Sequence, residues 1–226
     1  MNISPGQDLK SRIAEAAKRQ ASPTRKSART AILLVVVAAL LFAASLFFWL
    51  GGMRIGDTEH GIPERPITFM CATVVGWSAI ALVATWLAFS RGSSMLGRRL
   101  PWLLGIAILT PAMLFGWMLF WNAQFPETMA EYVSRPGFRC LAFTLAMAAW
   151  PLVALSYVRR EKNPTYPAAA GAARGVAMGA LAGIVVDLWC PIAGPAHVLV
   201  GHITPILVLM GLGAAAGRVI TGIRAR

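Results

Sequence analysis

Six long apolar runs constrain the fold of this chain more than any other feature of its sequence. Of its 226 residues, 57% are hydrophobic and only 13% are charged, whereas a soluble domain usually carries about 25% charged residues. A helix needs about 20 mostly apolar residues to cross a bilayer, and these runs lack the period-two alternation of barrel strands. The sequence therefore predicts an all-α membrane protein with six transmembrane helices, at residues 31–50, 67–89, 102–121, 138–158, 171–189 and 198–217.

Short connectors leave no room for a large soluble domain between these runs. We expect one six-helix domain at 31–217, preceded by a basic tail at 1–30 and followed by a short basic end at 218–226. The first run is expected to remain in the protein as a helix. Its apolar stretch is longer than the core of a signal peptide, and no small-residue cleavage site follows it.

The positive charges are distributed unevenly along this layout. Most of the 21 Lys and Arg residues lie in the tail, in the second and fourth connectors and at the C-terminal end. Positively charged segments stay in the cytoplasm, so we expect both termini to be cytoplasmic. The net charge of +12 then reflects topology and attraction to anionic lipid. Direct binding of nucleic acid is not expected.

Glycines at four-residue spacing mark the fifth run, at Gly171, Gly175, Gly179 and Gly183, and the sixth run repeats the spacing at Gly213 and Gly217. Four-residue spacing places them on one helix face, where small residues let two backbones approach closely in lipid. The short connector favours packing of the fifth helix against the sixth within one chain. The alternative is the seam of a homodimer.

The histidines and cysteines, three of each, all fall on the outer side of this topology. His60 lies in the first outer loop, Cys71 and Cys140 lie near the outer ends of their helices, and three further residues gather at the last outer connector: Cys190, His197 and His202. Asp187 stands beside them, at the outer end of the fifth helix. A carboxylate in the apolar zone usually has a partner. We expect that partner to be His202, with helix capping as the alternative.

Three chemistries suit such a group of side chains. Thiolates and imidazoles bind Zn(II) or Cu(I), two cysteines form a disulfide in an oxidising compartment, and histidine senses pH. No C-x-x-C occurs, and the spacing of Cys190, His197 and His202 matches no standard zinc motif. These alternatives therefore stay open, together with simple packing of the cysteines as small apolar residues.

The sequence lacks the motifs of common enzyme classes. It contains no H-E-x-x-H, no G-x-S-x-G and no P-loop, so we do not expect an enzyme. The runs are also nearly free of charge within their interiors, which argues against ion transport through carboxylate relays.

Residues 8–20, DLKSRIAEAAKRQ, indicate a short helix in the basic tail. Leu9 and Ile13 fall on one face of it, with Lys and Arg on the others. An isolated helix of this length is marginal in water, so we expect it to become ordered on a soluble partner. The alternative is a basic anchor lying on the lipid surface.

In layout the chain resembles the NrsF/CarR type of bacterial membrane anti-sigma factors. The resemblance is carried by the Gly/Ala-rich fifth helix, by Cys190 and Pro191 opening the last outer loop, by Cys140 at the start of the fourth helix, and by the small-residue-rich final helix with its basic end. It implies a six-helix protein of the bacterial inner membrane. Such a protein sequesters an extracytoplasmic-function sigma factor until an envelope signal, often oxidative or metal stress, is sensed.

The residue patterns described above, together with the resemblance, suggest roles for particular residues. Cys140 and Cys190 would sense the signal as a redox pair or as metal ligands, helped by His197, His202 and Asp187, while Leu9 and Ile13 would contact the sigma factor.

The second hypothesis for the function is a small multi-pass transporter or membrane accessory protein for metal or a small solute. It requires a continuous polar path, and the runs offer few residues to line one.

Overall fold

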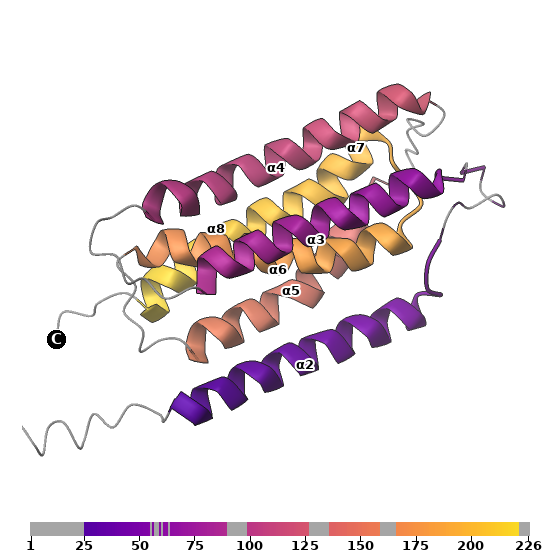
Figure 1. Cartoon of the computed structure of the whole chain (residues 1–226). Helices are drawn as coiled ribbons and strands as arrows, with labels where there is room; N and C mark the ends of the chain where they lie inside the picture. Colours follow the sequence, from indigo (N-terminus) through magenta and orange to yellow (C-terminus); the bar gives the residue numbers. More distant parts are fainter. Residues whose placement is uncertain are drawn as a thin grey trace, which may run out of the picture.

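The computed structural model describes residues 25–54, 56, 59, 61–62, 64–89, 99–126, 136–158 and 166–221. Six helical segments in this part are long and apolar enough to cross a membrane. The first five are α2 (Arg25–Trp49), α3 (Ile67–Phe89), α4 (Arg99–Gln124), α5 (Phe138–Val158) and α6 (Pro167–Trp189) (Figure 1). The sixth combines α7 (Pro195–Val198), a π-helical turn η4 (Leu199–Ile203) and α8 (Thr204–Thr221).

The predicted helices agree with those observed, with differences at the ends. The runs 67–89 and 138–158 coincide with α3 and α5. α6 begins at Pro167, earlier than the run predicted at 171–189, because proline is favourable in the first turn of a helix. The run predicted at 198–217 is not one regular α-helix, since it begins within α7 and passes through η4.

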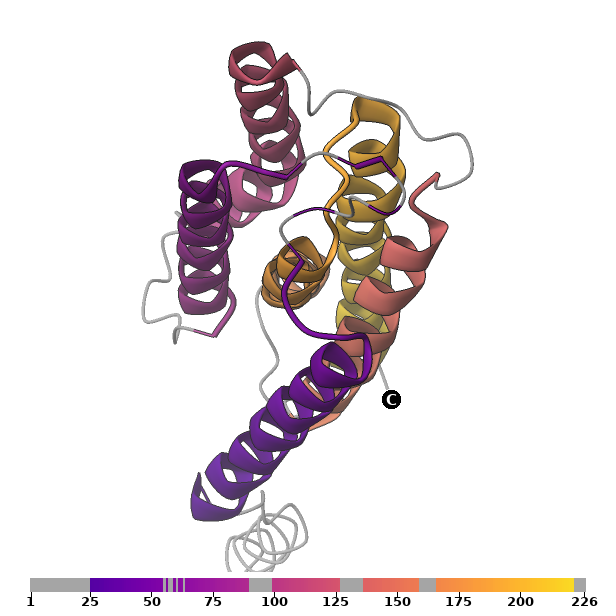
Figure 2. The same ribbon diagram turned by 90° about the vertical axis from the view of Figure 1, so that its right-hand side faces the viewer.

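α6 forms the centre of the bundle. In its membrane-crossing segment 78% of residues are buried, against 0% in that of α2. Figure 2 shows α6 between α3 and α4 on one side and α8 and α5 on the other, with α2 at the periphery. The side chains of α6 are small, which explains how one helix can be surrounded by so many others.

The glycine spacing of α6 is used within the chain. A Cβ atom on Gly171 would meet the backbone carbonyl of Gly213, and one on Gly175 would meet that of Leu209. Packing of α6 against α8, the interpretation favoured from the sequence, is therefore confirmed. Gly183 packs against α3 instead, because a Cβ there would lie 2.9 Å from the ring of Trp77.

The bundle has two distinct ends. The start of α2 and the end of α8 lie at the same end, here called the terminal end (Figure 1). The opposite end, here called the site end, holds the α2–α3 connector, the start of α5 and the loop from α6 to α7. Three predicted features lie outside the described residues: the tail helix with Leu9 and Ile13, the histidine His60, and the basic residues of the connectors at 90–98 and 159–165.

Candidate functional site

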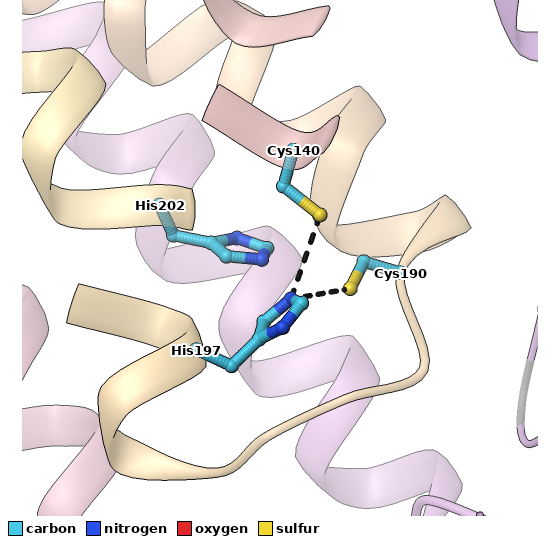
Figure 3. A group of neighbouring side chains, drawn as sticks. All are labelled: Cys140, Cys190, His197 and His202. Carbon is cyan, nitrogen blue, oxygen red and sulfur yellow. Dashed lines mark hydrogen bonds between the residues drawn. The ribbon is translucent and has the colours of Figure 1, made fainter. Parts of the chain in front are cut away.

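Four reactive side chains meet at the site end of the bundle (Figure 3). Cys140 comes from the first turn of α5, Cys190 directly follows α6, His197 belongs to α7 and His202 to η4. One potential ligand atom from each residue lies within 4.8 Å of the others. The four side chains are buried, with 3–4% of each residue exposed. We call this group the Cys/His cluster.

His197 is the central member of the Cys/His cluster. Its Nε2 atom lies 3.1 Å from Cys190 Sγ and 3.5 Å from Cys140 Sγ, and both cysteines are free thiols. A hydrogen bond with the Cys140 thiol lowers the pKa of the Cys190 thiol well below its ordinary value, and His197 acts in the same direction while burial opposes both. Cys190 is therefore the sulfur that most readily becomes a thiolate, the form that binds metals and attacks electrophiles.

The chain leaves and re-enters helical structure around Cys190 for local reasons. Pro191 cannot continue the hydrogen-bonding pattern of α6, and Pro195 provides a favourable first turn for α7. The loop between them is buried, so its polar backbone groups need partners. Asn122 of α4 supplies one by donating a hydrogen bond of 3.0 Å to the carbonyl of Ala193.

The π-helical turn brings the second imidazole to the first. His197 and His202 are five residues apart, and in a regular α-helix that spacing would point them about 140° away from each other. The π-helical turn η4 is wider and so reduces this angle. In it, Thr204 donates both its backbone N–H and its hydroxyl to the carbonyl of Leu199. The two ring centroids are 5.8 Å apart. Such turns occur frequently at functional sites.

Two glycines allow η4 to approach α5 closely. A Cβ on Gly201 would lie 2.9 Å from the Cβ of Cys140, and one on Gly137 would lie 2.7 Å from the carbonyl oxygen of His197. Gly137 also has a φ of +89°, a backbone conformation that other residues rarely adopt. These two glycines lie outside the four-residue pattern, so no signal in the sequence marks them.

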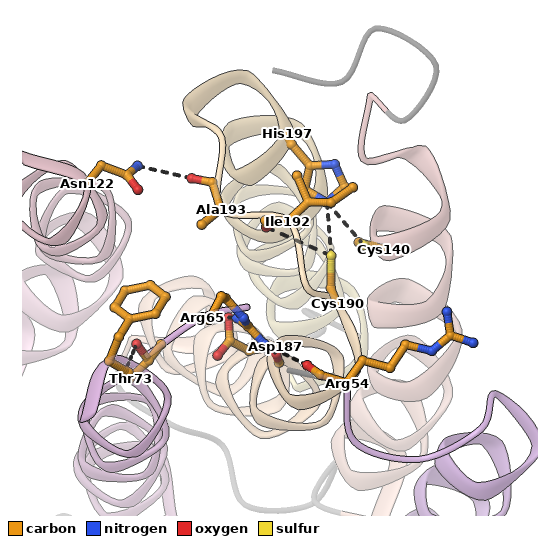
Figure 4. A network of polar contacts seen from close by, with 11 residues as sticks. Arg54, Arg65, Thr73, Asn122, Cys140, Asp187, Cys190, Ile192, Ala193 and His197 are labelled. Atoms are coloured by element: carbon orange, nitrogen blue, oxygen red, sulfur yellow. Dashed lines mark hydrogen bonds and ion pairs between the residues drawn. The ribbon is translucent and has the colours of Figure 1, made fainter. Parts of the chain in front are cut away.

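The prediction that Asp187 pairs with His202 is wrong. The Asp187 carboxylate instead lies 3.6 Å from Arg65, which also donates a hydrogen bond of 2.7 Å to the backbone carbonyl of Asp187 (Figure 4). Both residues are buried. A guanidinium presents several donors in a fork, so one Arg65 side chain neutralises the carboxylate and also satisfies an end carbonyl of α6.

Further contacts tie the α2–α3 connector to the end of α6. The backbone N–H of Arg54 donates to the carbonyl of Leu188 at 3.0 Å, and the indole of Trp189 donates to the carbonyl of Leu50 at 3.1 Å. Carbonyls at a helix C-terminus lack partners within the helix. The connector therefore caps α6 immediately before Cys190 and links that position to α2.

The residues predicted to gather at the outer face do not all meet. Four form the Cys/His cluster and Asp187 lies one turn of α6 before Cys190. Cys71 is an exposed residue of α3 and does not belong to the group. His60 lies outside the described residues.

Comparison with known proteins identifies a family to which the chain is similar. The model of a protein family described as negative regulator of sigma F, NrsF, matches residues 16–221. No curated protein and no solved structure matches the chain.

The ion pair beside the Cys/His cluster yields a first prediction. Replacing Arg65 with Met should lower the free energy of unfolding by about 3–5 kcal/mol, because it leaves the Asp187 carboxylate buried and unpaired. The double variant Arg65→Met with Asp187→Leu should recover most of this loss. Thermal unfolding in detergent measures both, with Arg54→Met, at an exposed side chain, as the control. Equal stability of the single and double variants would contradict the pairing.

Proposed function

Because the chain belongs to the family of negative regulators of sigma F, it is a negative regulator of a sigma factor, and we propose how it works. It sequesters an extracytoplasmic-function sigma factor at the bacterial inner membrane and releases it when an envelope signal, metal or redox, reaches the Cys/His cluster. The observation that carries this proposal is the burial of four thiol and imidazole side chains together at one end of the helix bundle.

The distribution of charge supports the orientation that this function needs. The basic tail and the basic C-terminal end both lead to the terminal end of the bundle. Positively charged segments stay in the cytoplasm, where the sigma factor is. In this orientation the site end faces the envelope, and a metal or oxidant can reach the Cys/His cluster without crossing the membrane.

The tail is the proposed contact with the sigma factor. Leu9 and Ile13 would form one apolar helical face in a segment that is otherwise rich in charge. Burying such a face on a soluble partner gains apolar contact that the short helix cannot obtain alone. The tail continues directly into α2, so displacement of α2 would displace the capture segment.

The contacts at the site end offer a route for the signal. Cys190 immediately follows Trp189, whose indole is hydrogen-bonded to Leu50 just beyond α2. Arg54, in the same connector, is bonded to Leu188. A displacement of Cys190 is therefore transmitted to the end of α2 by two hydrogen bonds, and through α2 to the tail.

The packing of α6 gives no support to the alternative of a small transporter. At the centre of the bundle α6 places residues that are wholly buried and apolar: Ala173, Val176, Ala177 and Ala180. A translocation path would need a continuous run of polar groups, and the two buried charged side chains of α6, Arg174 and Asp187, are separated by this apolar stretch.

The tail hypothesis makes a prediction about capture. The variant with Leu9→Asp and Ile13→Asp should lose the sigma factor in a pulldown from membranes while still inserting normally. The matched control carries Ser11→Asp and Ala14→Asp, which add the same charge to the opposite helical face and should keep the partner. Full retention of the sigma factor by the Leu9/Ile13 variant would rule out this face as the contact.

The sensor hypothesis makes a prediction about release. Cys140→Ser and Cys190→Ser should each leave the sigma factor bound but abolish its release by oxidant or thiophilic metal, because each removes one sulfur of the Cys/His cluster. Cys71→Ser, at the exposed cysteine, should respond as the unmodified protein does. Normal release from the Cys140→Ser, Cys190→Ser double variant would show that these cysteines only pack.

A further inference from the structure

The donor atoms of the Cys/His cluster already surround a single point. In a regular tetrahedron each edge is about 1.63 times the bond length, so zinc bonds of about 2.0 Å to nitrogen and 2.3 Å to sulfur give edges of about 3.3–3.8 Å. His197 Nε2 lies 3.1 and 3.5 Å from the two sulfurs, and all four donors lie within 4.8 Å of one another. Modest contraction of the cluster would therefore complete a tetrahedral site.

His202 supplies an independent indication of a missing ligand. Its Nε2 atom is buried and has no hydrogen-bond partner among the described residues, and the residue is only 4% exposed. Figure 3 shows its ring extending toward the two cysteines and His197. Buried polar atoms nearly always have a partner, and a cation held between the four side chains would be that partner.

The charge of the donor set selects the valence of the ion. Two thiolates and two neutral imidazoles carry a charge of −2, and burial makes any uncompensated charge costly. A divalent ion gives a neutral site, whereas a monovalent ion leaves one negative charge. The nearby Asp187 does not change this balance, because Arg65 neutralises it.

The chemistry of the donors selects the class of ion. Magnesium and calcium prefer oxygen ligands, whereas a tetrahedral set of two sulfurs and two nitrogens is typical of zinc. We propose that Cys140, Cys190, His197 and His202 together bind one divalent, thiophilic cation of the zinc class, in tetrahedral coordination. This deepens the proposed function, on which it rests for the meaning of the signal.

Binding of one divalent ion releases two protons, so the net charge of the site does not change. Each cysteine thiol releases one proton as its metal–sulfur bond forms, and both imidazoles bind through neutral nitrogens. The buried site is thus neutral before and after binding. The start of α5 is already packed closely against η4, so contraction of the four donors would displace Cys190, and the end of α6 would carry that displacement toward α2.

Metal binding by the purified full-length protein in detergent tests this inference without the sigma factor. One Zn(II) per chain should remain after dialysis. His202→Ala and His197→Ala should each weaken Zn(II) binding by more than about 100-fold, which exceeds the usual effect of losing a partner outside the coordination sphere. His60→Ala and Cys71→Ser are the matched controls, and both should retain one Zn(II).

Two further measurements separate loss of a ligand from loss of folding. His202→Cys restores a fourth donor and should bind Zn(II) where His202→Ala does not. Co(II) substituted into the unmodified protein should give the intense visible bands of tetrahedral cobalt and thiolate-to-cobalt charge transfer. Weak octahedral bands, or equal Zn(II) content in the unmodified protein and the His197→Ala, His202→Ala double variant, would overturn the proposed site.

The outcomes also distinguish the metal site from the sensor function. If the unmodified protein binds no Zn(II) but release of the sigma factor still requires Cys140 and Cys190, the metal site is refuted and the redox form of the sensor stands. If one Zn(II) binds through all four side chains but release of the sigma factor is unchanged in the cysteine variants, the metal site stands and the proposed function fails.

Discussion

Direct contact between the backbones of α6 and α8 fixes the relative position of the two segments that carry most of the Cys/His cluster. Glycines at Gly171, Gly175 and Gly213 remove the side chains that would otherwise hold these helices apart. In lipid, where apolar side chains gain little by leaving the solvent, such close packing is a main source of helix association. α6 and α8 are packed side by side, so a short loop is enough to join them. It therefore holds Cys190, His197 and His202 together at the site end.

The same arrangement makes the Cys/His cluster a junction between helices. Cys140 belongs to α5. The contacts of Arg65, Arg54 and Trp189 join the end of α6 to the connector that leads back to α2. α2 lies at the periphery, where it packs mainly on α5 and none of its membrane-crossing segment is fully buried. A peripheral helix that is linked at one end to the cluster and continues at the other into the tail is suited to carrying a displacement from one end of the bundle to the other.

The sequence predicted the helices well and the contacts between distant residues poorly. Hydropathy identifies segments such as 138–158 because a bilayer requires a continuous apolar helix, and topology then placed both cysteines of the cluster at one end. The pairing of Arg65 with Asp187 joins residues 122 positions apart, and no local pattern indicates it. The π-helical turn was also missed, since the spacing of His197 and His202 acquires its meaning only when the turn is wide.

Simultaneous measurement of metal occupancy and sigma-factor binding tests the account most directly. The full-length protein would be held in lipid nanodiscs with its co-purified, fluorescently labelled sigma factor, and Zn(II) would be added while bound metal and fluorescence anisotropy are followed together. The account predicts that the sigma factor dissociates as one site per chain fills, with the same midpoint for both signals. Complete filling of the Cys/His cluster while the sigma factor stays bound would contradict it.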